Sequence, residues 1–168
     1  NEWKTLLAGN SLAPKSRATV EPLLTTKWNQ GTPFNNMCPT YGSERTVTGC
    51  VATAMAQIMN YWEWPKTGVS SHSYTSTAIG STHNVNFANT TYDWANMKKK
   101  HYPGDTQAQK EAIGTLMFHC GVGVEMQYGG YEYDGSGAVT GNYQSDDDVC
   151  AQNALWKYFR YRKNGLVS

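Results

Sequence analysis

The sequence has little net charge, no long hydrophobic run and no paired-cysteine motif. Its 168 residues carry a formal charge of +1, and 16% of them are charged, which is below the usual fraction of about a quarter. A net charge this close to zero does not indicate the strongly positive surface that binding to nucleic acid or to an anionic membrane surface requires. Because no stretch of eighteen or more apolar residues occurs, no segment is predicted to span a membrane.

The cysteines are few and widely separated. Cys38, Cys50, Cys120 and Cys150 form no C-x-x-C pair, and their spacing matches no common zinc site. Four cysteines over this length are too few for a disulfide scaffold. One disulfide among the three cysteines other than Cys50 stays an open alternative, but the pattern favours mostly free, buried thiols.

The most informative stretch is a helix predicted between Cys50 and Pro65. Its apolar residues recur at the spacing of one helical face. Thr48 is the expected N-cap, Gly49 gives the preceding turn its freedom, and Pro65 ends the helix. The face predicted to be buried consists of Val51, Ala54, Met55, Ile58, Met59 and Trp62.

Cys50 is therefore expected in the first turn of this helix. The first backbone N–H groups of a helix have no partner within it, and the helix dipole is positive there. Such a position favours a thiolate and makes the sulfur a better nucleophile. The alternative is that Cys50 is a small buried residue, which is the commonest fate of a cysteine. Position alone does not decide between the two.

Gln30 lies in a predicted turn ahead of this helix, between Asn29 and Gly31. A glutamine amide placed there would suit an oxyanion hole, in which a side-chain N–H and the backbone N–H of Cys50 bind the same oxygen. The alternative is a solvated glutamine in a turn, which spacing alone would favour.

Shorter patterns predict the remaining elements. Alternating residues between positions 66 and 92 suggest a hairpin, and His72 and His83 within it are interpreted as surface residues.

Two further helices are expected, one from Thr106 to about residue 120 and one beginning at Ser145, each opened by a capping box. His119 would interact as a cation with the end of the first of these helices. The acidic triplet from Asp146 is interpreted as part of the second helix start rather than as a metal site.

The segment 122–144 holds six glycines and four tyrosines, without a phosphate-binding pattern. Such a loop can let a peptide backbone come close, or it can be a plain loop.

Two segments, WNQG-x-PFN from Trp28 and TGCVATAMAQIM-x-Y from Thr48, resemble the secreted bacterial cysteine peptidases typified by streptopain and interpain. Shorter matching blocks follow at 92–94, 112–122 and 128–136. The resemblance covers most of the chain from about Thr25 onward, and the block around Cys50 is long and specific.

The resemblance implies a secreted cysteine endopeptidase with an α+β papain-like fold, of which this chain would hold mainly the helical lobe. By this resemblance, Cys50 of this chain would be the nucleophile and Gln30 would provide the oxyanion-hole side chain. Ser136, with Gly135 before it, is similar to a contact with the substrate backbone. The resemblance also implies that the substrates are proteins or peptides and that the precursor carries an N-terminal inhibitory propeptide. It implies no metal or organic cofactor.

One departure from the family concerns the catalytic histidine, which there lies in a Gly-Gly-His segment of the β-rich lobe. No such segment occurs in this sequence. We therefore expect residues 1–25 to form an arm and residues 26–168 the helical lobe, with the histidine supplied by a further segment or a second chain. A cut near Ser168 would explain this arrangement, and a truncated or inactive copy is the competing explanation. The alternative function is a non-catalytic, peptidase-like binding domain.

Overall fold

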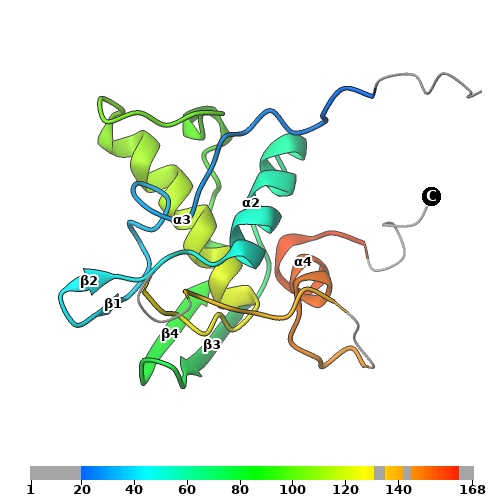
Figure 1. The fold of residues 1–168 in the computed structure, drawn as a ribbon. Helices are drawn as coiled ribbons and strands as arrows, with labels where there is room; N and C mark the ends of the chain where they lie inside the picture. The colour runs from blue at the N-terminus through cyan, green and yellow to red at the C-terminus, as the bar shows by residue number, and fades with distance from the viewer. Residues whose placement is uncertain (1–19, 131–134, 142–144, 163–168) are drawn as a thin grey trace, which may run out of the picture.

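The computed structural model describes residues 20–130, 135–141 and 145–162. Two helices, α2 (Cys50–Trp62) and α3 (Gln107–Gly123), pack against each other at its centre. A two-stranded antiparallel hairpin lies below them in Figure 1, and α4 (Ala151–Phe159) lies beside them. The hairpin consists of β3 (Ser71–Ser76) and β4 (Ser81–Asn86). The short elements are β1 (Thr40–Tyr41), β2 (Glu44–Arg45), η1 (Phe87–Asn89) and η2 (Trp94–Asn96).

The helix α2 begins at Cys50 as predicted, but its buried face is rotated from the predicted one. Val51, Met55 and Met59 are buried as expected, whereas Ile58 and Trp62 are 40% and 66% exposed. Ala52 and Ala56 take part in the core instead and are fully buried. Short side chains at these two positions let α3 approach closely, and Ala54, Ile58 and Trp62 of the predicted stripe are left on the outer side.

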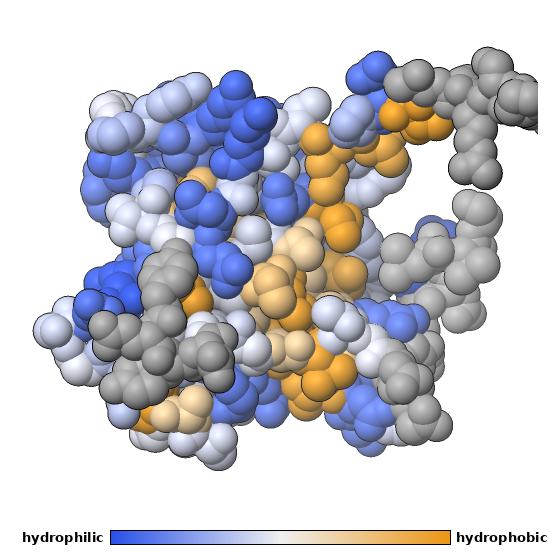
Figure 2. Space-filling model, viewed as in Figure 1, coloured by the Kyte–Doolittle hydropathy of each residue, from blue (hydrophilic) through white to orange (hydrophobic). Residues whose placement is uncertain are grey.

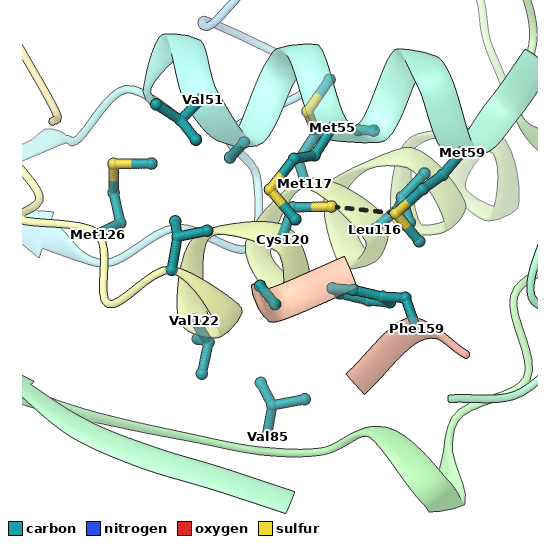
Figure 3. Close-up of a cluster of buried hydrophobic side chains, with 14 of the residues drawn as sticks. Val51, Met55, Met59, Val85, Leu116, Met117, Cys120, Val122, Met126 and Phe159 are labelled. Carbon is teal, nitrogen blue, oxygen red and sulfur yellow. Dashed lines mark hydrogen bonds between the residues drawn. The ribbon is translucent and has the colours of Figure 1, made fainter. Parts of the chain in front are cut away.

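The core forms where α2 and α3 meet. Met55 and Met59 of α2 face Leu116 and Cys120 of α3, with Phe159 of α4 closing the cluster (Figure 3). The Sγ atom of Cys120 lies 3.7 Å from the Sδ atom of Met59. Sulfur atoms are polarisable and their side chains adapt to irregular gaps, which suits a core built from two helices of uneven surface.

The helix α3 confirms its capping box and corrects its end. Thr106 accepts a hydrogen bond from the Gln109 backbone, and the Gln109 side chain accepts one from the Thr106 backbone. The helix then continues to Gly123, beyond the predicted end. His119 is buried rather than cationic: burial lowers its pKa to about 4, and its Nδ1 lies 3.1 Å from the Tyr92 hydroxyl. The expectation that His119 acts through the helix dipole is therefore wrong.

The helix α4 begins at Ala151, six residues after the predicted start at Ser145. Ser145 and Asp148 do bond to each other, with 2.9 Å between the Ser145 backbone N and Asp148 Oδ2, but they form a turn ahead of the helix. The Asn153 amide donates to the carbonyl oxygens of Ser145 and Asp148 at 3.1 and 2.9 Å. The Asn153 side chain thus holds this turn against α4. The residues predicted to form a capping box therefore form a turn that precedes the helix.

Other expectations have mixed outcomes. The hairpin is confirmed, but His83 within it is buried rather than on the surface. All four cysteines are free, and all except Cys50 are buried, as predicted. The predicted arm falls mostly on residues 1–19, outside the described residues. Directly after the predicted arm, Thr26 donates a hydrogen bond of 2.7 Å from Oγ1 to Gln57 Oε1 of α2.

Candidate active site

A buried loop delivers Cys50 to the surface. Thr46, Val47, Thr48 and Gly49 are all buried, and Cys50, the first residue of α2, is exposed. Gly49 occupies the N-cap with φ +85°, a conformation that residues with a side chain rarely adopt. A Cβ atom added there would come within 2.5 Å of the Met126 side chain. Backbone angle and packing therefore both require glycine before the thiol.

The predicted cap at Thr48 is wrong, because its side chain bonds elsewhere. Thr48 Oγ1 lies 2.8 Å from Thr53 Oγ1. Thr53 in turn donates to the Gly49 carbonyl oxygen from both its backbone N (3.1 Å) and its Oγ1 (3.0 Å). The N-cap residue Gly49 provides no side-chain cap. The first backbone N–H groups of α2, which lie beside Cys50, can therefore bind other acceptors.

The loop that carries Gln30 is tied to the loop that carries Cys50. The Thr48 backbone N–H donates to the Gln30 carbonyl oxygen at 3.1 Å, and the Asn35 amide donates to the Thr46 carbonyl oxygen at 2.9 Å. Gln30 is half-buried. Within the described ranges, neither its side-chain amide nor the Cys50 thiol has a hydrogen-bond partner. The structure thus bonds the backbone of Gln30 to Thr48, which lies two positions before the predicted nucleophile in the sequence.

Ser136 joins the glycine-rich segment to the same loop. Its Oγ donates to the Val47 carbonyl oxygen at 2.7 Å, and the Gly129 backbone N–H donates to that Oγ at 3.0 Å. The Val47 backbone N–H donates to the Gly129 carbonyl oxygen at 3.1 Å. A Cβ atom on Gly49 would lie 3.1 Å from the Ser136 carbonyl oxygen. The Ser136 side chain is therefore structural, and its main chain lies against Gly49, the residue directly before Cys50.

None of the four histidines, all of which lie in the described ranges, is hydrogen-bonded to Cys50. Each has a different neighbour within 3.1 Å of a ring nitrogen. The pairs are His72 with Glu125, His83 with Ser81, His101 with Asp105 and His119 with Tyr92. Burial lowers the pKa of His83, His101 and His119. The sequence contains no further histidine that could serve as the base.

The outer face of α2 is hydrophobic toward the end of the helix. Figure 2 shows a band of hydrophobic surface over this helix. Its large exposed residues include Ile58, Tyr61 and Trp62 on α2, and Leu24 on the segment before it is 39% exposed. The rotation of α2 described above therefore leaves an apolar surface on the second half of this helix, about two to three turns from Cys50.

The described residues contain no group of three or more His, Cys, Asp or Glu side chains placed to hold a metal ion. No helix among them combines the length and the apolar character that crossing a membrane would require.

Sequence reasoning missed one contributor to the site, Met126. Its side chain packs against Gly49, and its carbonyl oxygen accepts a hydrogen bond from the Tyr74 hydroxyl at 2.6 Å. No local pattern pairs residues so far apart in the sequence, and the glycine at position 49 was the one available signal that something packs closely there.

Known proteins match this chain over most of its length. The thiol protease/hemagglutinin PrtT of Porphyromonas gingivalis is 32% identical over 146 residues, and streptopain of Streptococcus pyogenes is 32% identical over 129 residues. These matches cover 86% and 66% of this chain. They cover 15% and 32% of the two relatives, so the chain spans less than a third of each.

The fold is similar to solved cysteine protease structures. Active wild-type interpain A of Prevotella intermedia matches with a TM-score of 0.71 at 44% identity, over 82% of this chain and 54% of that one. A mutant fragment of prointerpain A matches with a TM-score of 0.70 at 37% identity, over 94% of this chain and 50% of that one. The predicted α+β papain-like fold, present in part, is confirmed.

The predicted resemblance to streptopain and interpain is likewise confirmed. A family model described as the peptidase C10 family matches residues 28–168. The match covers well over half of the chain, and the chain therefore belongs to the peptidase C10 family.

Proposed function

We propose that this chain is the nucleophile-bearing part of a cysteine endopeptidase. Cys50 is the nucleophile, and the Gln30 side chain and the Cys50 backbone N–H form the oxyanion hole. The observation that carries the proposal is the position of Cys50. It is the one exposed cysteine of the four, it begins a helix of 13 residues, and the Gln30 loop bonds to the residue two positions before it.

In the proposed reaction the Cys50 thiolate attacks the carbonyl carbon of a peptide bond. The electron pair of the C=O bond moves to the oxygen, which the two N–H donors stabilise, each contributing about 10²–10³ in kcat in comparable enzymes. A histidine takes the thiol proton beforehand and gives it to the departing amine as the C–N bond breaks. Water then hydrolyses the thioester, releasing the acid product and the free thiol.

The histidine comes from outside this chain, either from a following segment or from a second chain. This part of the proposal is supported by the four histidines, each of which has a neighbour other than Cys50. The hydrophobic outer face of α2 supports it as well, because a large exposed apolar patch commonly marks an interface, and this one lies on the helix that begins at Cys50. A lobe that covers this face would bring its own residues close to Cys50.

Three further features belong to the proposal. The substrates are proteins or peptides whose backbone lies against the main chain of Gly135 and Ser136. The precursor carries an N-terminal propeptide, which the match to a prointerpain fragment supports. The mature enzyme is secreted, as its resemblance to secreted peptidases implies.

The test is casein hydrolysis by the complete peptidase, in which this chain is joined to the rest of its precursor, and by its Cys50→Ala variant. We expect hydrolysis that is lost on substitution, and covalent labelling of Cys50 by a thiol-directed epoxide. The matched control is Cys150→Ala, which removes a buried thiol. An inactive wild-type protein whose Cys50 the epoxide leaves unlabelled would favour a non-catalytic binding domain.

A further inference from the structure

We propose that two buried threonines, Thr48 and Thr53, are positioning residues that orient the oxyanion hole. Their two hydroxyl groups, here the hydroxyl pair, fix the direction of the Cys50 backbone N–H and join it to the loop that carries Gln30. The inference rests on the proposed function and assigns a role to two side chains besides the nucleophile and the two donors. Thr48 is fully buried, and Thr53 is 7% exposed.

The direction of the Cys50 N–H depends on the carbonyl group of Gly49. The two groups belong to one peptide unit, which is planar and trans, so they point in opposite directions. Gly49 adopts φ +85° and ψ +141°. Glycine has no side chain to restrict these angles, and the peptide unit after it can therefore turn more freely than one that follows another residue. Bonds to the Gly49 oxygen must then supply the restraint.

Thr53 supplies two such bonds. Its backbone N–H donates to the Gly49 carbonyl oxygen at 3.1 Å, which is the ordinary hydrogen bond of an α-helix. Its Oγ1 donates to the same oxygen at 3.0 Å. A carbonyl oxygen has two lone pairs, so Thr53 provides a donor for each of them. A carbonyl held by two donors turns less freely than one held by the backbone bond alone, and the Cys50 N–H on the same peptide unit is restrained with it.

Thr48 connects this carbonyl to the other donor of the oxyanion hole. The hydrogen of the Thr53 hydroxyl is used on Gly49, so Thr48 is the donor of the 2.8 Å bond between the two hydroxyl oxygens. The Thr48 backbone N–H donates to the Gln30 carbonyl oxygen at 3.1 Å. Thr48 thus bonds to the Gln30 loop through its backbone and to Thr53 through its side chain. The hydroxyl pair therefore sets the two donors relative to each other.

A purely local role for Thr53 is the alternative, because threonine hydroxyls in helices commonly bond to the carbonyl oxygen four residues back. Such a bond would affect the stability of the helix start and leave the chemical step unchanged. Thr53→Val separates the two roles, since valine has nearly the shape of threonine and lacks the hydroxyl. The double variant Thr48→Val with Thr53→Val keeps the test usable if the single variant misfolds. Replacing both partners of a hydrogen bond by apolar groups of the same shape can be nearly neutral for stability.

The experiment compares the complete peptidase with Thr53→Val, Thr53→Ser and the double variant. Steady-state kinetics on a peptide substrate gives kcat and KM, and the rate at which iodoacetamide alkylates Cys50 is measured separately. Alkylation displaces iodide and forms no oxyanion, so its rate depends on the thiol and not on the oxyanion hole. The control is Thr75→Val with Thr82→Val, which removes an exposed pair of hydroxyls 2.8 Å apart on the β3–β4 hairpin.

We expect Thr53→Val and the double variant to lower kcat by about 10–100-fold, because a misdirected N–H costs no more than the about 10²–10³ lost with a removed donor. KM and the alkylation rate should stay within about twofold of wild type, since the hydroxyl pair acts on the transition state alone. Thr53→Ser keeps the hydroxyl and should retain most of kcat. The control should match wild type in all three quantities.

A folded double variant whose kcat equals that of wild type would overturn the inference and leave the proposed function standing. A kcat that falls together with the alkylation rate would also overturn it, because the hydroxyl pair would then hold the thiol rather than the donors. A raised KM at unchanged kcat would do the same. Failure of wild type to cleave any peptide, with Cys50 unlabelled by the epoxide, would overturn the proposed function and this inference with it.

Discussion

The Ser136 hydroxyl donates a 2.7 Å hydrogen bond to the carbonyl oxygen of Val47, three residues before Cys50. The same oxygen atom of Ser136 accepts the Gly129 backbone N–H at 3.0 Å. This side chain therefore joins two segments about ninety residues apart, and the single hydrogen bond that its hydroxyl can donate is made within the fold. The contact with substrate that we propose for Ser136 consequently belongs to its main chain, and the hydroxyl keeps that main chain in place.

Ser136→Ala should lower the free energy of unfolding by about 2–3 kcal/mol. The change leaves the buried Val47 carbonyl and the Gly129 N–H without this partner, and an unsatisfied buried polar group costs about 1–3 kcal/mol. Urea unfolding measures the loss. Ser73→Ala, on an exposed position of β3, is the control and should change stability by no more than about 0.5 kcal/mol. Equal stabilities of the two variants would contradict the structural role of Ser136.

Iodoacetamide should modify Cys50 at least about tenfold faster than the other three cysteines in the folded chain. Thiolates are the reactive form, and burial raises the pKa of Cys38 to about 12 and that of Cys120 further. Peptide mapping by mass spectrometry identifies the labelled residue. Cys50→Ala should abolish the fast reaction, and all four wild-type thiols should react in urea. Fast labelling of Cys120 in the native chain would show that the α2–α3 core opens readily.

Local patterns predicted three features of the fold well. The start of α2 at Cys50, the capping box of Thr106 and the hairpin all depend on residues within a few positions of each other. Gln30 and Cys50 were selected as site residues by resemblance, and the structure brings their loops together through the bond from Thr48. Their chemical roles remain predictions.

Long-range packing accounts for what the sequence did not reveal. Periodicity placed Ile58 and Trp62 on the buried face of α2, because the pattern cannot tell which of two adjacent apolar faces meets α3. His119 was interpreted as a cation at the end of its helix because nothing nearby in the sequence indicated the Tyr92 ring that packs against it. The late start of α4 depends on Asn153, whose bonds to the preceding turn outweigh the local capping signal.

Gly49→Ala should destabilise the chain by roughly 2–4 kcal/mol. The left-handed conformation costs a residue with a side chain about 1–2 kcal/mol, and the collision with Met126 adds an overpacking cost of about 1–3 kcal/mol. Gly80→Ala is the matched control, because Gly80 also has a positive φ of +66° but open space around it. Urea unfolding of both variants separates the two costs. Equal losses would mean that Met126 moves aside freely.

Gln30→Ala should lower kcat of the complete peptidase by about 10²–10³-fold and change KM little. An oxyanion-hole donor acts on the transition state, so its removal slows the chemical step without weakening substrate binding comparably. Steady-state kinetics on a peptide substrate gives both constants. Gln107→Ala, on an exposed position at the start of α3, should match wild type. A raised KM at unchanged kcat would instead make Gln30 a substrate-binding residue.

The stability of the chain should fall as the pH is lowered from about 6.5 toward 4, and His119 should account for much of the loss. Burial lowers the pKa of His119 to about 4 in the folded chain, while an exposed histidine titrates near 6.5. Between these values the unfolded state binds a proton that the folded state does not, so unfolding is favoured by up to about 3 kcal/mol as the pH falls.

The variant His119→Asn removes this titrating group and isolates its contribution. We expect it to be less stable than wild type at pH 7, because it loses packing against Phe87 and Tyr92, and to lose less stability on acidification. Burial also lowers the pKa of His83 and His101, but both remain in each protein, so the difference between the two pH curves reports on His119. Urea unfolding at several pH values between 7 and 4 provides the curves. Parallel curves would mean that His119 takes up its proton in the folded state as readily as in the unfolded one, and the buried, neutral imidazole beside Tyr92 would then be the wrong description of this core.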